Sequence, residues 1–68
     1  MKEFKDILRQ LRKKKGLSQR ELAQRIGASE NAYLRWENGL NYPGFFFIIE
    51  LAQALGCTTD ELLLGEKP

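Results

Sequence analysis

The chain contains no histidine and a single cysteine, and this shortage excludes two kinds of site. Zinc sites are built largely from Cys and His ligands, and too few of these soft ligands are present. An internal disulfide needs a second cysteine, so Cys57 is expected as a core thiol in a reducing cytoplasm. We therefore expect no metal and no cofactor.

Long apolar runs are also missing. No stretch approaches the roughly 20 apolar residues that span a bilayer, and the first residues contain no apolar signal-peptide core. A chain of 68 residues makes one domain with a small core, which leaves no room for a catalytic or effector-binding domain. No nucleophile–base pair stands out. We expect a cytoplasmic protein that is not an enzyme, with no membrane contact and no small-molecule effector site.

Positive charge is concentrated in the N-terminal part of the chain. The net charge is only +2, but residues 1–25 hold nine Lys/Arg against three Asp/Glu, whereas residues 26–68 hold two against six. This asymmetry favours an oriented encounter with a polyanion. The run Arg12–Lys15 has a second explanation, because basic residues also stabilise the C-terminus of a helix. Both effects can operate together.

Residues 18–39 contain two short helical patterns separated by a tight glycine turn. Ser18 precedes Glu21 with the spacing of a capping box. Gly27 is placed to end the first helix, Ser29 to cap the second, and Gly39 to close it. Such a unit is a helix-turn-helix, whose second helix can enter a DNA major groove, although an ordinary αα-corner has the same spacing. The inward residues of the first helix are Leu22, Ala23 and Ile26, and Tyr33 and Trp36 take the inward or edge positions of the second.

Three further helices complete an all-α prediction. Residues 3–15 form an amphipathic helix, residues 45–55 a longer apolar one, and residues 60–64 a short last one. We expect the helix at 45–55 to bury Phe45, Ile48, Leu51, Ala52 and Leu55, and the last helix to bury Leu62. The chain is thus predicted to be a compact bundle of five short helices, one domain over 1–68, folded over about 4–64 and frayed at 65–68.

Several large apolar residues fall outside the predicted core. Phe46 lies opposite the buried arc of its helix, beside Phe47 at the edge, and Leu63 and Leu64 follow Leu62. An exposed aromatic pair near Tyr42 is unusual for a soluble monomer. We interpret Phe46, Phe47, Leu63 and Leu64 as a candidate dimer or partner surface. The alternative for the aromatic residues is a core wider than the one drawn above.

The order and spacing of these residues resemble the lambda-repressor-like family of Cro and XRE-type regulators. The resemblance runs from about Phe4 to Leu64 and is carried by Gly16-Leu17-Ser18-Gln19, Glu21-Leu22-Ala23, Gly27, Ser29, Arg35-Trp36-Glu37-Asn38-Gly39, Pro43, Glu50-Leu51-Ala52, Ala54-Leu55-Gly56 and Asp60-Glu61-Leu62-Leu63. It implies sequence-specific binding of double-stranded DNA by a bacterial or phage-encoded transcription regulator. Repression by operator occupancy is the expected mode, with a homodimer, at least on DNA, bound to a palindromic operator.

By this resemblance, the base-reading positions are Glu30, Asn31, Ala32 and Arg35. Their chemistry suits the role: Asn31 fits an adenine edge, Arg35 fits guanine, and Ala32 fits a thymine methyl group. Glu30 can accept a hydrogen bond from cytosine, but we prefer the interpretation that an acid stabilises the first turn of a helix.

The residues expected at the DNA backbone are Gln19, Ser29, Asn38 and Asn41. The resemblance gives Gln19 the role of a backbone clamp at the free amides of a helix N-terminus, and a merely hydrated Gln is the alternative. The loop at 40–44 carries no charge where many relatives have Lys or Arg, so phosphate contacts should be few. That loop, Glu30 and the exposed aromatics favour a second hypothesis, a protein-interaction module of the same fold with little or no DNA binding.

Glu37 lies near the end of its helix, where the helix dipole disfavours an acid unless a cation is close. In the family that the chain resembles, an Arg of the first helix pairs with this Glu, and the matching residue is Arg12. We predict a partly buried Arg12–Glu37 salt bridge that orients the second helix of the motif.

Overall fold

The structure is a computed structural model that describes residues 3–65. Its helices are α1 (Phe4–Lys14), α2 (Gln19–Ile26), α3 (Glu30–Glu37), α4 (Phe45–Leu55) and α5 (Thr59–Leu64). Residues 3–65 contain no strand, so the all-α, five-helix prediction is confirmed, and the helices expected at 3–15, 45–55 and 60–64 begin and end within one residue of those bounds. Of the predicted frayed tail, Gly65 caps α5 and residues 66–68 lie outside the described residues.

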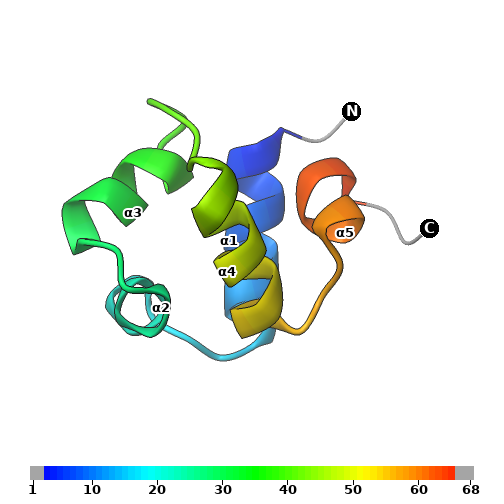
Figure 1. The fold of residues 1–68 in the computed structure, drawn as a ribbon, viewed down its shortest axis with the longest axis horizontal. Coiled ribbons are helices and arrows are strands. Elements are labelled where there is room, and N and C mark those ends of the chain that lie inside the picture. The colour runs from blue at the N-terminus through cyan, green and yellow to red at the C-terminus, as the bar shows by residue number, and fades with distance from the viewer. Residues whose placement is uncertain (1–2, 66–68) are drawn as a thin grey trace.

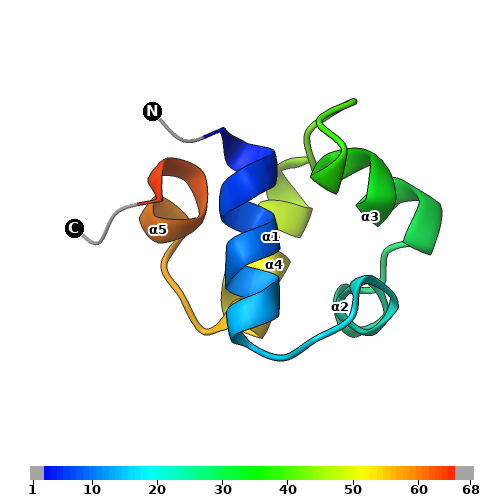
Figure 2. The same cartoon turned by 180° about the vertical axis from the view of Figure 1, so that it is seen from behind.

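The two helices of residues 18–39, α2 and α3, lie together at one end of the molecule. Figures 1 and 2 show α2 and α3 on one side of α1 and α4, and α5 on the other. α3 packs against both α1 and α2, while α5 packs against α1 and α4. Among residues 3–65, no helix is long and apolar enough to cross a membrane.

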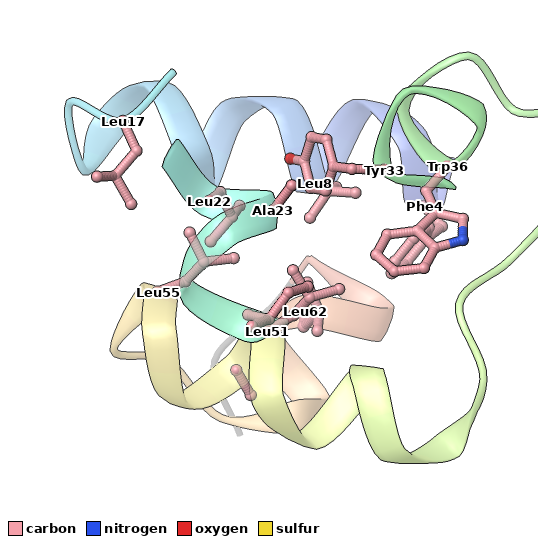
Figure 3. Close-up of a cluster of buried hydrophobic side chains, with 12 residues drawn as sticks. Phe4, Leu8, Leu17, Leu22, Ala23, Tyr33, Trp36, Leu51, Leu55 and Leu62 are labelled. Carbon is pink, nitrogen blue, oxygen red and sulfur yellow. The ribbon is translucent and has the colours of Figure 1, made fainter. Parts of the chain in front are cut away.

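The core lies between α1 and α4 and is closed by the remaining helices (Figure 3). Leu8, Leu22, Leu51 and Leu62 are completely buried, and each buried leucine stabilises the fold by about 1.5–3 kcal/mol. Leu62 is therefore a core residue, as predicted. The half-buried Cys57 packs against this core, and burial raises the pKa of its thiol. The other members of the cluster are Phe4, Leu17, Ala23, Ile26, Tyr33, Trp36, Ala52 and Leu55.

The ends of α2 follow the sequence signals directly. The Ser18 hydroxyl accepts the Glu21 amide at 3.0 Å, and the Glu21 carboxylate accepts the Ser18 amide at 2.9 Å. This is the predicted capping box, and it satisfies two backbone donors that a helix start leaves without partners. At the other end, Gly27 adopts φ 76°, a left-handed conformation that glycine reaches without the steric cost of a Cβ.

One expectation about α4 is wrong. Phe45 is 83% exposed instead of buried, because it is the first residue of α4 and side chains on a helix lean toward its N-terminus. Its side chain therefore extends past the end of the core. Phe47, which is half-buried, takes the inward place, with its ring centroid 5.4 Å from that of Trp36. The apolar stripe of α4 is thus Phe47, Ile48, Leu51, Ala52 and Leu55.

Candidate nucleic-acid interface

The turn between α2 and α3 is short because both of its ends are capped. After Gly27, the Ala28 amide donates to the Ala23 carbonyl at 3.0 Å, which closes the last turn of α2. The Ser29 hydroxyl then accepts the Ala32 amide at 3.1 Å and begins α3. This side-chain cap satisfies one free amide of α3 and fixes the direction in which that helix leaves the turn. The two helices pack against each other as a helix-turn-helix (Figure 1).

α3 has two clearly different faces. Tyr33, Trp36 and Glu37 are buried, whereas Glu30, Asn31 and Arg35 are exposed. The Arg35 guanidinium makes no hydrogen bond or ion pair with any part of the described chain. Three of the four predicted base-reading residues thus share an open face. The fourth, Ala32, is half-buried and packs against the core, which leaves less of its methyl group for a ligand.

The four predicted backbone-contact residues lie at the two ends of α3, in the loop that follows it and at the start of α2. Ser29, Asn38 and Asn41 are exposed, at the N-cap of α3, the C-cap of α3 and the following loop respectively. Gln19, the first residue of α2, is half-buried. Its amide nitrogen donates to the Glu37 carboxylate at 3.1 Å, a contact across 18 residues that sequence reasoning did not predict.

The predicted ion pair between Arg12 and Glu37 is present and more buried than expected. The Arg12 Nε lies 2.7 Å from Oε2 and its second amino group 3.2 Å from Oε1, a two-pronged contact in which the Glu37 side chain is fully buried. Arg12 also donates to the Leu17 carbonyl at 2.8 Å. Its hydrogen bond to Glu37 raises the pKa of the guanidinium. The pair ties α1 to the last turn of α3.

Further groups converge on the same carboxylate. The Tyr33 hydroxyl, also fully buried, donates to Glu37 Oε2 from one turn earlier in α3. Burial alone would raise the pKa of Glu37, but the hydrogen bonds from Arg12, Tyr33 and Gln19 outweigh it and hold the pKa below its usual value. Burial and the neighbouring carboxylate in turn raise the pKa of Tyr33. Glu37 is therefore charged at neutral pH, and its carboxylate is held by side chains from α1, α2 and its own helix, α3.

Arg9 completes this cluster through the backbone. One of its amino groups donates to the Glu37 carbonyl at 3.1 Å, and its Nε lies 3.7 Å from Oε1. A cation at this place also offsets the negative end of the α3 dipole. Two sequence signals pointed toward the cluster: Tyr33 and Glu37 are four residues apart on one helix, and Arg9 and Arg12 share a face of α1.

Known proteins resemble the chain in both sequence and structure. A family model described as helix-turn-helix matches residues 8–62. Relatives include the transcriptional activator BcrR of Enterococcus faecalis, 38% identical over 96% of this chain and 32% of that protein, and the phage repressor RstR of Vibrio cholerae, 35% identical over 88% and 54%. The crystal structure of the P22 c2 repressor with a synthetic operator superposes with a TM-score of 0.90 and 30% identity, covering 97% of this chain and 100% of that one. The chain spans roughly a third to a half of these curated relatives.

Proposed function

The chain belongs to the lambda-repressor-like, XRE-type helix-turn-helix family, and on that premise we propose that it is a transcription regulator that binds double-stranded DNA sequence-specifically. α3 enters the major groove, and occupancy of an operator is the mode of action. The observation that carries the proposal is the open face of α3, where Glu30, Asn31 and Arg35 are exposed and the Arg35 guanidinium has no partner within the described residues. The TM-score of 0.90 with an operator-bound repressor supports it.

Each side chain on this face has a base edge that it suits. The planar guanidinium of Arg35 fits the two acceptors of guanine, and the amide of Asn31 fits adenine. The partly covered Ala32 offers a small apolar contact to a thymine methyl group. Glu30, in the first turn of α3, stabilises the positive end of the helix dipole and accepts from cytosine where that base is presented.

Neutral side chains hold the phosphates. One N–H of the Gln19 amide is used by Glu37, and the second is left for a phosphate oxygen beside the N-terminus of α2. Because Glu37 also holds Tyr33 of α3, the backbone contact and the reading helix are aligned by one carboxylate. Ser29, Asn38 and Asn41 add polar contacts without charge. Binding should consequently depend on salt less steeply than in a protein that uses Lys and Arg here.

A homodimer on a palindromic operator supplies the affinity that one domain lacks. A single reading helix covers few base pairs, and two-fold symmetric half-sites about 34 Å apart place both helices on one side of the duplex. By its relatives, the protein works in the bacterial cytoplasm or is phage-encoded.

Selection of bound sequences from a random duplex pool, repeated at two salt concentrations, tests the proposal. If the proposal is right, the selection enriches a palindromic sequence at both salt concentrations. The spacing of its half-sites then gives the geometry of the dimer. A pool that never enriches, with binding that disappears at the higher salt, would contradict sequence-specific reading. That result would favour the alternative, a protein-interaction module of the same fold, to which the uncharged loop at 40–44 and the exposed aromatics also point.

A further inference from the structure

The segment that follows α3, where contacts to the DNA backbone are expected, carries no charge of its own. Residues 38–49 contain no Asp, Glu, Lys or Arg, and the exposed side chains of Asn38 and Asn41 are neutral. Asn38 is also the C-cap of α3, where the helix dipole has its negative end. A phosphate beside Asn38 is therefore favourable only if another part of the fold brings a cation close.

Two cations of α1 lie against this segment. The Arg9 guanidinium donates to the carbonyl of Glu37, the residue before Asn38, at 3.1 Å. The Lys5 side chain lies over Gly39, the residue after it, with Cδ only 2.9 Å from the place that a Cβ would take. Glycine has no Cβ and leaves room for this close approach. Figures 1 and 2 show the N-terminal half of α1 beside the C-terminal end of α3.

The charge of Arg9 is not needed to satisfy Glu37. The Oε1 atom of this carboxylate accepts hydrogen bonds from Arg12 and Gln19, and its Oε2 atom accepts from Arg12 and Tyr33. These bonds use the whole accepting capacity of a carboxylate. The Arg9 Nε, 3.7 Å from Oε1, lies beyond hydrogen-bond distance. Two guanidinium groups thus face one carboxylate, and one positive charge is left over.

This excess charge is open to solvent. The Arg12 side chain is only 11% exposed, whereas that of Arg9 is 42% exposed and uses one N–H group for its hydrogen bond to the backbone. The Lys5 side chain is 38% exposed and lies 3.8 Å from the carboxylate of Glu3. Glu3 is itself 72% exposed, and such a surface pair is weak. Both cations can therefore bind a phosphate without breaking a buried contact.

We propose that Lys5 and Arg9 of α1 supply the positive charge for the phosphate contact at the end of α3, in place of the cations that the loop at 40–44 lacks. This role rests on the DNA binding proposed above and adds two residues of α1 to it. A planar guanidinium binds phosphate through paired N–H groups, and an ammonium binds it as a point charge. Each contact makes binding depend on salt more steeply than the neutral loop alone would, and does so for every sequence alike.

The salt dependence of DNA affinity separates a phosphate contact from a structural role. Fluorescence anisotropy with the selected duplex, at about 50 and 200 mM salt, measures it. Because each neutralised phosphate contributes about 0.9 to the slope of log affinity against log salt, Arg9→Gln and Lys5→Gln should each lose about 3.5-fold less affinity over this range than the wild-type chain. Arg9→Lys keeps the charge and should keep the wild-type slope. A purely structural loss would weaken binding by the same factor at both concentrations.

Lys14→Gln is the matched control, because it removes the same charge from another side of α1. Lys14 lies in a hollow with Glu61 of α5, and both views place α5 across α1 and α4 from α3. The end of α5 exposes Leu63 and Leu64, apolar side chains that do not suit a phosphate. Lys14→Gln should therefore bind the duplex with the wild-type salt slope.

Two outcomes overturn the proposal in different ways. If the selection enriches a palindrome but Arg9→Gln and Lys14→Gln have equal slopes, the α1 contact is wrong and the DNA-binding function stands. If the wild-type chain binds no duplex at either salt concentration, both are wrong. Circular dichroism checks that each variant is folded. Should Arg9→Gln unfold, Lys5→Gln decides, and a wild-type slope in that variant would reject the contact.

Discussion

Arg12 and Glu37, 25 residues apart in the chain, meet in a two-pronged contact of 2.7 and 3.2 Å between α1 and the last turn of α3. The carboxylate is fully buried, and its remaining contacts come from Gln19, Tyr33 and Arg9. A buried charge is tolerated only when its partners satisfy it completely. No buried side-chain N or O atom within residues 3–65 lacks a hydrogen-bond partner, and this cluster meets that condition. The orientation of the proposed reading helix therefore depends on a carboxylate that is buried inside the protein.

Arg12→Ala should destabilise the fold strongly. Removing the guanidinium leaves the buried Glu37 charge without its main partner, which costs about 3–5 kcal/mol. That loss approaches the whole free energy of unfolding of a small domain, about 5 kcal/mol. Urea denaturation measures it. Lys13→Ala, an exposed neighbour on the same helix, is the control and should change the free energy of unfolding by about 0.5 kcal/mol at most. Similar losses for both variants would contradict the role of the pair.

Acid should unfold the protein through Glu37. The pKa of this carboxyl is lower in the folded chain than in the unfolded one. Its contribution to the free energy of unfolding is therefore complete above the unfolded pKa of about 4.3, and it is lost as the pH falls through the folded pKa. Hydrogen bonds from Ser18 also lower the pKa of Glu21, which adds to the same trend. Urea denaturation between neutral and acidic pH should therefore show falling stability. Glu37→Gln should be less stable at neutral pH, and its free energy of unfolding should change less with pH across this range. If the pH dependence is the same as in the wild-type chain, Glu37 is not the group responsible.

Tyr33→Phe isolates the hydroxyl that donates to Glu37. Because a buried hydrogen bond to a charged group contributes about 1.5–3 kcal/mol, the variant should lose stability of that order while keeping its ring in the core. The midpoint temperature of thermal unfolding should fall by about 4–8 °C for each kcal/mol of stability lost. Tyr42→Phe is the control, since the exposed Tyr42 hydroxyl makes no hydrogen bond with the rest of the described chain. Equal melting temperatures for the two variants would mean that the Glu37 contact adds nothing.

Arg35→Ala and Gln19→Ala should affect DNA binding differently. With the selected duplex and its single-base variants as probes, loss of Arg35 should relax discrimination at one base pair by about 1–3 kcal/mol. Loss of Gln19 should weaken binding to every sequence alike, because a phosphate contact carries no base information. Gln19→Ala also removes a hydrogen bond to Glu37, so its affinity is compared at a temperature where circular dichroism shows a folded chain. Uniform weakening by both substitutions would overturn the reading role of Arg35.

The sequence by itself determined where the helices begin and end. Capping boxes, apolar periodicity and helix-ending glycines act over a few residues, so Ser18, Gly27 and Ser29 could be interpreted without knowledge of their surroundings. The same local pattern also separated the buried and open faces of α3. The Arg12–Glu37 pair was expected from a family resemblance rather than from local physics.

Only the tertiary structure decided which residues far apart in the chain meet. Gln19 reaches Glu37 across 18 residues and Arg9 reaches it across 28, and such contacts depend on how three helices pack. Phe45 had the right periodicity for the core, but periodicity gives a direction around a helix and not a position along it. The first residue of α4 extends beyond the packed interior, and its exposure, together with that of Tyr42, Leu40 and Phe46, follows from where the core ends.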